Sequence, residues 1–333
     1  MLHIAILGCA HIHISDVIKI ISQRNDIAVK TVWDHQSNRA KQCANTLNAQ
    51  VASSPNAIWE DPDISAVLIL SETDQHFPLV IGSASAKKHL FIEKPLGITA
   101  YDTLTMAEAI ERENLVFQTG YFLRSAPIQQ CLYEHIHHHQ SFGKITRIQG
   151  HFSHAGGLLG WFDNEWRWMA DGLHAGFGAF GDLGTHVLDL LMWYMGDVES
   201  ATADMTAASD RYQNGDEYGL GILRFKNNCL GLIDASWVDF SSPLGLHVQG
   251  TEGTAHVINN QLFIHSRHIP ASDPTKPWAD LPQALPHPLD QFLDVLLKKH
   301  AYPLTTASEA AKRCVVMEAL YKAAKSKSWI SIA

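Results

Sequence analysis

The first third of the chain alternates short apolar runs with amphipathic helical patterns. Leu2–Leu7 is an apolar run, residues 14–21 repeat apolar side chains at helical spacing, and Ile27–Trp33 is rich in β-branched residues. A helical pattern follows over about 37–47. A strand, a helix and a second strand in this order predict a βαβ unit with parallel strands and a right-handed crossover.

The alternation continues as far as Tyr121. Further strand-like runs and helical patterns alternate at 64–70, 77–86, 89–92, 101–113 and 115–119. Repeated units of this kind predict a doubly wound parallel sheet with helices on both faces.

From Gly143 onward the pattern changes to short strands separated by turns. The strand-like runs lie at 144–152, 200–206, 218–225, 229–237, 245–250, 254–258 and 261–265. Turn-forming residues between them predict hairpins in an open, mostly antiparallel sheet. Helical patterns occupy 181–195, about 289–299 and 307–325, and 269–288 reads as an irregular loop.

The length of 333 residues fits two domains. We therefore expect an α/β protein with a doubly wound domain over 1–122 and an α+β domain over 123–333. The last helices of the second domain can pack back on the first.

The charge balance argues against two classes of partner. The chain has 34 acidic and 25 basic residues, a net charge of −9 with neutral histidine. Nucleic-acid-binding proteins and polybasic membrane anchors usually carry a basic surplus, so we expect neither partner. No apolar run approaches the roughly 20 residues that a membrane helix needs.

The N-terminus and the cysteines indicate the cellular compartment of the protein. Ile6-Leu7-Gly8-Cys9 resembles a lipoprotein cleavage box, but no lysine or arginine precedes Lys19, so the positive region of a signal peptide is missing. The five cysteines are scattered and form no C-x-x-C pair, as expected of reduced thiols. Both observations predict a cytoplasmic protein.

The turn after the first strand is a candidate phosphate loop. Where a dinucleotide loop has G-x-G-x-x-G, this chain reads Gly8-Cys9-Ala10-His11-Ile12-His13 and keeps one glycine of three. Ala10 is a small replacement, whereas His13 could contact a phosphate or simply cap the turn. A generic turn between a strand and a helix remains the alternative.

Asp34 ends the second strand, where an acidic residue takes the ribose hydroxyls of a bound dinucleotide. A carboxylate there would repel a 2′-phosphate. The sequence therefore favours NAD, with NADP the less favoured cofactor.

Lys94 follows the strand at 89–92 and precedes Pro95. Proline restricts the preceding residue to an extended conformation, and the carboxyl end of a parallel strand faces the ligand crevice. Lys94 could therefore point at a ligand. A surface lysine in a loop is the alternative.

The apolar helix at 181–195 carries Asp182 and His186 four positions apart, so their side chains share one face. They could act together, or Asp182 could be a helix N-cap and His186 a core histidine. Upstream, the aromatic run 161–168 could stack on sugar rings or form a packing cluster between domains.

The chain has 20 histidines, which raises the question of a metal. His135, His137, His138 and His139 are too close together for a good tetrahedral site, and no H-E-x-x-H exists. We expect no metal.

Taken together, these segments resemble the Gfo/Idh/MocA oxidoreductases, named for glucose–fructose oxidoreductase, inositol dehydrogenase and a rhizopine-catabolism protein. The resemblance covers essentially the whole chain. It is carried by 4–8, Asp34 with Arg39, 71–76, 88–96, 120–124 and 181–186. The Glu93-Lys94-Pro95 element and the Asp182-x-x-x-His186 element, in this order, are jointly specific.

The resemblance implies an N-terminal Rossmann domain that binds NAD. It also implies a C-terminal domain whose sheet packs against its copy in a homodimer or homotetramer. The implied cofactor-binding residues are Gly8, Ala10, His11, His13, Asp34, His35, Arg39, Ser71, Thr73, His76, Glu93, Lys94 and Arg167. The chain departs from the family in its phosphate loop and at Ser71-Glu72-Thr73-Asp74, where the family often has a proline. The acidic residues there again disfavour NADP.

The resemblance also implies the chemistry, which is hydride transfer between nicotinamide and a hydroxyl of a sugar, cyclitol or related polyol. His186 would be the general base, Lys94 would stabilise the alkoxide, and Asp182 would orient the hydroxyl or hold the other two in place. The implied substrate-binding residues are Tyr121, Arg124, His154, Trp161, Trp166 and Asp182.

Two other functions fit the same pattern. One is a glycosidase that uses NAD transiently, by oxidising a sugar, eliminating the aglycone and reducing the product again. The other is a catalytically silent sensor of NAD and sugar. A sensor should have lost the equivalents of Lys94 or His186, and both are present.

Overall fold

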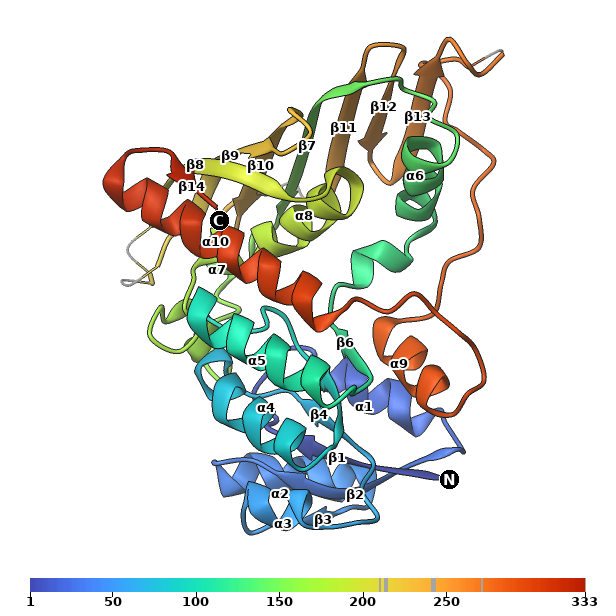
Figure 1. Ribbon diagram of the computed structural model, residues 1–333. Helices are drawn as coiled ribbons and strands as arrows, with labels where there is room; N and C mark the ends of the chain where they lie inside the picture. Colours follow the sequence, from blue (N-terminus) through green and yellow to red (C-terminus); the bar gives the residue numbers. More distant parts are fainter. Residues whose placement is uncertain (210, 213–214, 241–243, 271, 333) are drawn as a thin grey trace.

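The computed structural model describes residues 1–209, 211–212, 215–240, 244–270 and 272–332 (Figure 1). The first of its two sheets has six parallel strands in the order β3-β2-β1-β4-β5-β6. The strands are β1 (Leu2–Leu7), β2 (Ile27–Trp33), β3 (Gln50–Val51), β4 (Ala66–Ile69), β5 (His89–Ile92) and β6 (Phe117–Thr119). Strand order reverses between β1 and β4, which places a ligand crevice at their carboxyl ends.

Helices cover both faces of this sheet, as the alternating pattern predicts. They are α1 (Ile14–Ser22), α2 (Ser37–Leu47), α3 (Pro55–Trp59), α4 (His76–Ser85) and α5 (Ala100–Arg112). Alternate residues of β1 point to opposite faces: Ile4 and Ile6 join the core under α1 and α2, and Ala5 and Leu7 join the core under α4 and α5.

The second sheet has eight strands in the order β13-β12-β11-β7-β10-β9-β8-β14. They are β7 (Ile145–Ser153), β8 (Val198–Thr206), β9 (Tyr218–Phe225), β10 (Leu230–Ser236), β11 (Gly245–Gly250), β12 (Gly253–Ile258), β13 (Gln261–Ser266) and β14 (Ile330–Ser331). All neighbours are antiparallel except β7 and β10, which confirms the mostly antiparallel sheet.

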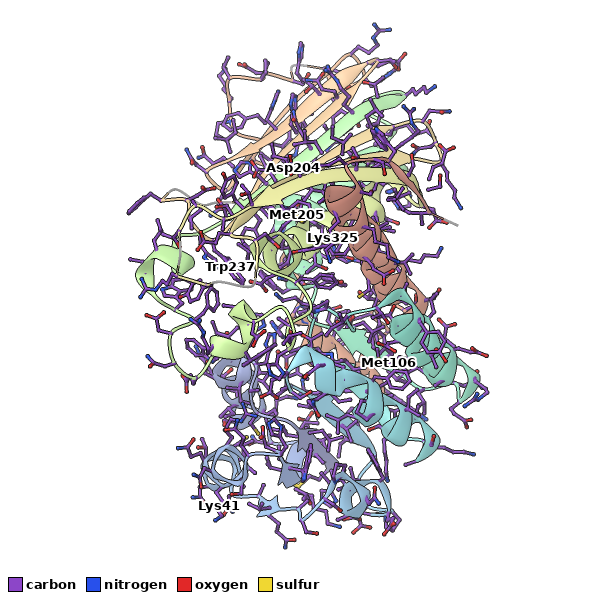
Figure 2. All side chains as sticks on the ribbon, turned by 90° about the vertical axis from the view of Figure 1, so that its left-hand side faces the viewer. Lys41, Met106, Asp204, Met205, Trp237 and Lys325 are labelled. Atoms are coloured by element: carbon purple, nitrogen blue, oxygen red, sulfur yellow. The ribbon has the colours of Figure 1, made fainter. Side chains whose placement is uncertain are left out.

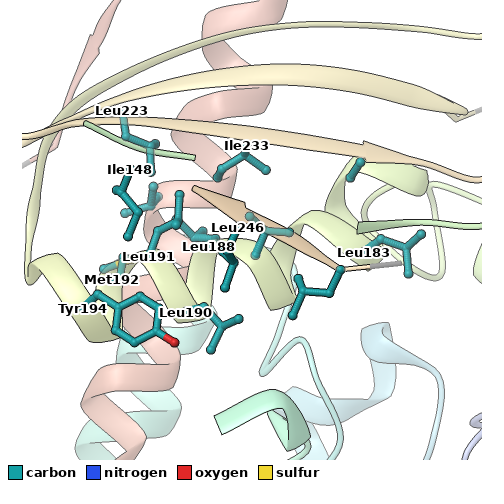
Figure 3. Close-up of a cluster of buried hydrophobic side chains, with 14 of the residues drawn as sticks. Ile148, Leu183, Leu188, Leu190, Leu191, Met192, Tyr194, Leu223, Ile233 and Leu246 are labelled. Carbon is teal, nitrogen blue, oxygen red and sulfur yellow. The ribbon is translucent and has the colours of Figure 1, made fainter. Parts of the chain in front are cut away.

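One face of the second sheet packs on α8 (Ala179–Met195), a helix that is buried along nearly all of its length. Leu188 and Leu191 of α8 lie in one cluster with Ile148, Leu223 and Ile233 of three strands (Figure 3). On β9 the buried and exposed residues alternate strictly, so the opposite face of the sheet is open.

The second part also contains α6 (Pro127–His137) and the single turn α7 (Gly156–Leu159).

The two last helices return to the first sheet, as the sequence suggests. Leu289 and Phe292 of α9 (Pro288–Leu296) join the core under α1 and α2. The helix α10 (Ala307–Ser326) contributes Ala310 to the first part's core and Leu320 to the second part's core. The chain's end thus ties the two sheets together, and the boundary at 122/123 stays a prediction.

In the part of the chain that the structure describes, no helix is long and apolar enough to cross a membrane.

Candidate active site

Lys94 and Asp182 form an ion pair between the two sheets. Lys94 follows β5 at the carboxyl edge of the first sheet, and Asp182 lies in the first turn of α8. Lys94 Nζ donates to Asp182 Oδ1 at 2.7 Å and to the Asp182 carbonyl at 3.3 Å. Both side chains are largely enclosed, with 3% and 16% of their surface exposed. The ammonium group is therefore held in one position rather than moving on a flexible stem.

The other carboxylate oxygen of Asp182 accepts a hydrogen bond from Trp237, whose Nε1 lies 3.0 Å from Oδ2. Trp237 follows β10 and is almost fully buried, and Figure 2 shows it beneath the second sheet. Burial raises the pKa of Asp182, but the Lys94 ammonium outweighs burial and holds that pKa well below its usual range. Asp182 is therefore a fixed carboxylate at neutral pH.

His186 lies one turn along α8 and is also buried. Its ring makes edge contacts with Tyr121, Phe122 and Phe152, at centroid distances of 6.2, 5.0 and 5.8 Å. Burial, followed by the nearby Lys94 ammonium, lowers the pKa of His186 well below its usual value. Its Nδ1 has no hydrogen-bond partner among the described residues. His186 is thus a neutral imidazole with an unused nitrogen beside an ammonium group.

The loop between β1 and α1 packs closely against the residue after β4. Gly8 has a φ of +87°, and a Cβ there would lie 2.4 Å from the Ser71 Cβ, so only glycine fits. The His11 amide donates to the Leu70 carbonyl at 2.9 Å. His13 is the N-cap residue of α1 but gives it no side-chain cap. A close-packed glycine turn and an uncapped helix N-terminus at the crevice fit the pyrophosphate of a dinucleotide.

Glu93 lies beneath this loop with two histidines facing it. Its carboxylate is 3.3 Å from His13 Nδ1 and 3.9 Å from His11 Nδ1. Burial lowers the pKa of His11 to about 3, so this imidazole is neutral. Burial raises the pKa of Glu93, but the two histidines and Lys94 bring it below its usual range. Within the described ranges, these three side chains are the one group close enough together to hold a metal ion.

Asp34, at the tip of β2, and Glu72, after β4, both form ion pairs with Arg39. Arg39 donates to Asp34 Oδ1 through Nε and Nη2, at 3.1 and 3.0 Å. Its Nη2 also donates to Glu72 Oε1 at 2.8 Å. His35 lies beside the group, with Nε2 at 3.7 Å from Glu72 Oε1. The predicted ribose-binding residues are therefore brought together, with Glu72 as an added member.

A small cavity of about 20 Å³ lies between the loop and α8. The residues around it include His11, Thr73, Lys94, Trp168, Phe177 and Asp182. Trp168 ends the aromatic run noted in the sequence but was not among the predicted site residues. Its Nε1 donates to the Ala10 carbonyl at 3.1 Å and joins the second part of the chain to the loop after β1. Of the other candidates after β4, His76 is buried with Nδ1 3.1 Å from the Leu96 carbonyl.

The predicted substrate residues are only partly gathered here. His154 lies within electrostatic reach of Asp182 and Lys94, and its ring packs on Trp161 with centroids 4.7 Å apart. Trp161 is 45% exposed. Trp166 packs against the core of the second sheet. Arg167, which was predicted to bind the cofactor, is not among the residues around the cavity, and its guanidinium lies 5.0 Å from the centre of the Tyr212 ring.

Tyr121 and Arg124 both line a second cavity, and Tyr121 also contacts the His186 ring. The Tyr121 hydroxyl lies 3.1 Å from Thr185 Oγ1, next to His186. Arg124 makes a two-point ion pair with Asp189, at 2.8 and 2.5 Å, and a further contact with Glu309 at 3.3 Å. The second cavity is also lined by Tyr133 and Trp193.

Two family models match this chain. The model described as "Oxidoreductase family, NAD-binding Rossmann fold" matches residues 2–121, and the GFO/IDH/MocA C-terminal domain matches 134–256. Among solved structures, a levoglucosan dehydrogenase in complex with NADH and L-sorbose has a TM-score of 0.81 at 17% identity, covering 100% of this chain and 99% of that one. At this identity the match shows the fold.

Several relatives of known activity are similar in sequence. Myo-inositol 2-dehydrogenase from Thermotoga maritima is 30% identical over 219 residues, which are 64% of this chain and 62% of that protein. Levoglucosan dehydrogenase from Pseudarthrobacter phenanthrenivorans is 28% identical over 54% of this chain and 45% of its own length. The chain therefore spans less than two thirds of these two relatives. The scyllo-inositol 2-dehydrogenase (NAD(+)) from Bacillus subtilis is 24% identical over 76% of this chain and 72% of its own length.

Together the two family models cover most of the chain, in the order in which the structure shows the two sheets. The chain belongs to the GFO/IDH/MocA oxidoreductase family, whose N-terminal domain is an NAD-binding Rossmann fold.

Proposed function

We propose that this protein is an NAD-dependent dehydrogenase that transfers a hydride between nicotinamide and a hydroxyl-bearing carbon of a sugar, cyclitol or related polyol. The observation that carries the proposal is the Lys94–Asp182 ion pair of 2.7 Å, placed beside neutral His186 at the carboxyl edge of the Rossmann sheet. A fixed cation and an unused base together are what oxidation of an alcohol requires.

Oxidation of an alcohol removes a hydride from carbon and a proton from oxygen. NAD, when bound, accepts the hydride. The proton passes to the imidazole of His186, which is neutral and therefore able to take it. Lys94 stabilises the negative charge that develops on the substrate oxygen, because its ammonium is fixed before the reaction starts. Asp182 keeps that ammonium in position and can accept a hydrogen bond from the substrate hydroxyl.

The substrate class rests on the relatives and on an exposed tryptophan ring that packs on His154. The names of the relatives given above state that they act on inositols and on levoglucosan. In this chain, Trp161 presents an exposed ring beside His154, which suits the apolar face of a pyranose or cyclitol.

The test is the appearance of NADH when the protein is mixed with NAD and a panel of inositols, aldoses, methyl glycosides and sugar acids. The proposal expects NADH to form with one of these groups. If no group gives NADH although calorimetry shows NAD binding, the proposal is wrong. Cleavage of a glycoside without net NADH would instead indicate the transient-oxidation glycosidase.

We also propose a homodimer or homotetramer formed through the open face of the second sheet. Large apolar side chains are exposed there on three strands: Tyr218, Leu220 and Ile222 on β9, Leu230 on β10 and Ile258 on β12. Exposed apolar side chains on one face of a sheet form the kind of surface that a second copy covers.

A cytoplasmic location is part of the same proposal. All five cysteines are free and buried, which suits a reducing compartment. The proposal expects the protein in the soluble cytoplasmic fraction of its native cells, and its recovery from an exported fraction would contradict this location.

A further inference from the structure

Two carboxylates, Asp34 at the tip of β2 and Glu72 after β4, contact Arg39 and differ in how their oxygens are hydrogen-bonded. Asp34, at the tip of β2, has no exposed side-chain surface. Its Oδ1 accepts from the Gln36 amide at 2.7 Å and from Arg39, and its Oδ2 accepts from the Cys9 amide at 2.7 Å. These bonds tie the phosphate loop to the turn after β2. Asp34 is therefore engaged in holding the loops together.

Glu72, which follows β4, is in the opposite situation. Its Oε1 accepts from Arg39 Nη2 at 2.8 Å. Its Oε2 is buried and has no hydrogen-bond partner in the described structure. A buried acceptor without a donor is costly, and a ribose hydroxyl that donated to it would remove that cost.

Arg39 is the side chain that could bind the 2′-phosphate of NADP at this position. Its guanidinium already serves two carboxylates, so the three side chains together carry one net negative charge. The next acidic residue along the chain, Asp74, is paired with His174 at 2.8 Å between Oδ2 and Nδ1. A 2′-phosphate would therefore meet net negative charge and an arginine whose Nε and Nη2 donors are already in use.

We propose that Glu72 sets the preference of this protein for NAD over NADP, by engaging Arg39 and by offering Oε2 to a hydroxyl of the adenosine ribose. This inference rests on the proposed function, because it concerns the cofactor of that reaction. It assigns the main discriminating role to Glu72 through specific contacts, whereas the sequence pattern puts it mainly on Asp34 and attributes only added negative charge to Glu72 and Asp74.

The test is calorimetric measurement of the Kd for NAD and for NADP, with no substrate present. In the Glu72→Gln variant Arg39 is released from one carboxylate and Oε2 no longer carries charge. We expect the Kd ratio of NADP to NAD to fall by about tenfold or more, mainly through tighter NADP binding.

The matched control is Asp63→Asn, which removes one acidic charge from the same domain. Asp63 precedes β4 at the opposite edge of the sheet, is 65% exposed and pairs with Lys30. The Kd ratio of NADP to NAD in Asp63→Asn should equal that of the wild type. In the double variant Glu72→Gln with Arg39→Ala, the gain in NADP binding should disappear, because the phosphate has lost its partner.

The single variant Arg39→Ala tests the Arg39–Glu72 ion pair without changing Glu72. Since the guanidinium is already engaged, we expect little change in NADP binding. A large loss of NADP affinity in Arg39→Ala, or an unchanged Kd ratio in a folded Glu72→Gln variant, would overturn the proposal while leaving the dehydrogenase proposal intact. A wild-type protein that binds neither NAD nor NADP would contradict both the dehydrogenase proposal and the proposed role of Glu72.

Discussion

Trp237 Nε1 donates to Asp182 Oδ2 at 3.0 Å, while Lys94 Nζ donates to Oδ1 of the same carboxylate at 2.7 Å. The three groups come from a loop after β10, the start of α8 and the loop after β5. One carboxylate is thus held from two sides by parts of the chain that are far apart in sequence. The orientation of the Lys94 ammonium depends on this arrangement.

Replacing Trp237 with phenylalanine removes the indole donor but keeps an aromatic ring. We expect kcat to fall by about tenfold with little change in KM, because a hydrogen bond to a charged group is typically worth about 1.5–3 kcal/mol and here it orients groups at the reacting centre. Steady-state kinetics on the substrate that the panel identifies would measure this effect.

Trp193→Phe is the control for Trp237→Phe, because Trp193 stacks on Tyr133 beside a separate cavity. It should leave kcat unchanged. Equal kinetics in Trp237→Phe and wild type would show that Trp237 only fills space.

The pH dependence should reflect the buried histidine. Burial and the Lys94 ammonium place the pKa of His186 well below the ordinary value of 6.5. A base must be unprotonated to act, so kcat/KM should stay level as pH falls through 6.5 and decline only further into acid. A rate profile over the acid range would measure this. An acid limb with its midpoint at or above the ordinary histidine value would exclude His186, as described here, from the role of base.

The reaction should not need a metal. His11, His13 and Glu93 could hold an ion, but Lys94 already supplies the positive charge that the alkoxide requires. Prolonged dialysis against a chelator should therefore leave NADH formation at its original rate. Loss of activity on chelation, restored by zinc and absent in a His13→Ala variant, would make this cluster a metal site.

The open sheet face should carry the subunit contact. Leu220 is 51% exposed on β9, and its neighbours on the same face are also apolar. A glutamate at this position would put a charge opposite apolar surface of the second copy, so Leu220→Glu should shift the protein toward monomers in light scattering. Leu104→Glu, on an exposed helix face of the first domain, is the control and should not. A monomeric wild type would contradict the oligomer outright.

Much of the fold follows from periodicity. β1, β2, β5, β9 and β11 have the bounds that the sequence predicts, because each is an apolar or alternating run with clear turn residues beside it. β3 and α3 were not predicted, since two or five residues are too few to show a period. The pattern of the second sheet did not reveal that β7 and β10 pair in parallel, because alternation carries no information on strand direction.

The site was predictable only where a motif carried it. Lys94, Asp182 and His186 were predicted from two short motifs, and the structure brings them together, while their catalytic roles stay a prediction. Trp237 had no signal beyond a tryptophan after a strand. The partners of Arg124 could not be read from the sequence either, because Asp189 and Glu309 lie on two helices that meet only in the folded chain. Contacts between distant segments are set by packing, which local spacing does not encode.

The most direct test of the account is Lys94→Met, studied by kinetics and calorimetry together. Methionine keeps the length of the side chain and removes the charge, so turnover should fall by about a hundredfold or more while NAD still binds with nearly wild-type affinity. Lys87→Met, on an exposed lysine with 76% of its side chain accessible, should behave as wild type. A Lys94→Met enzyme with wild-type kcat would contradict the role of the Lys94–Asp182 pair in hydride transfer.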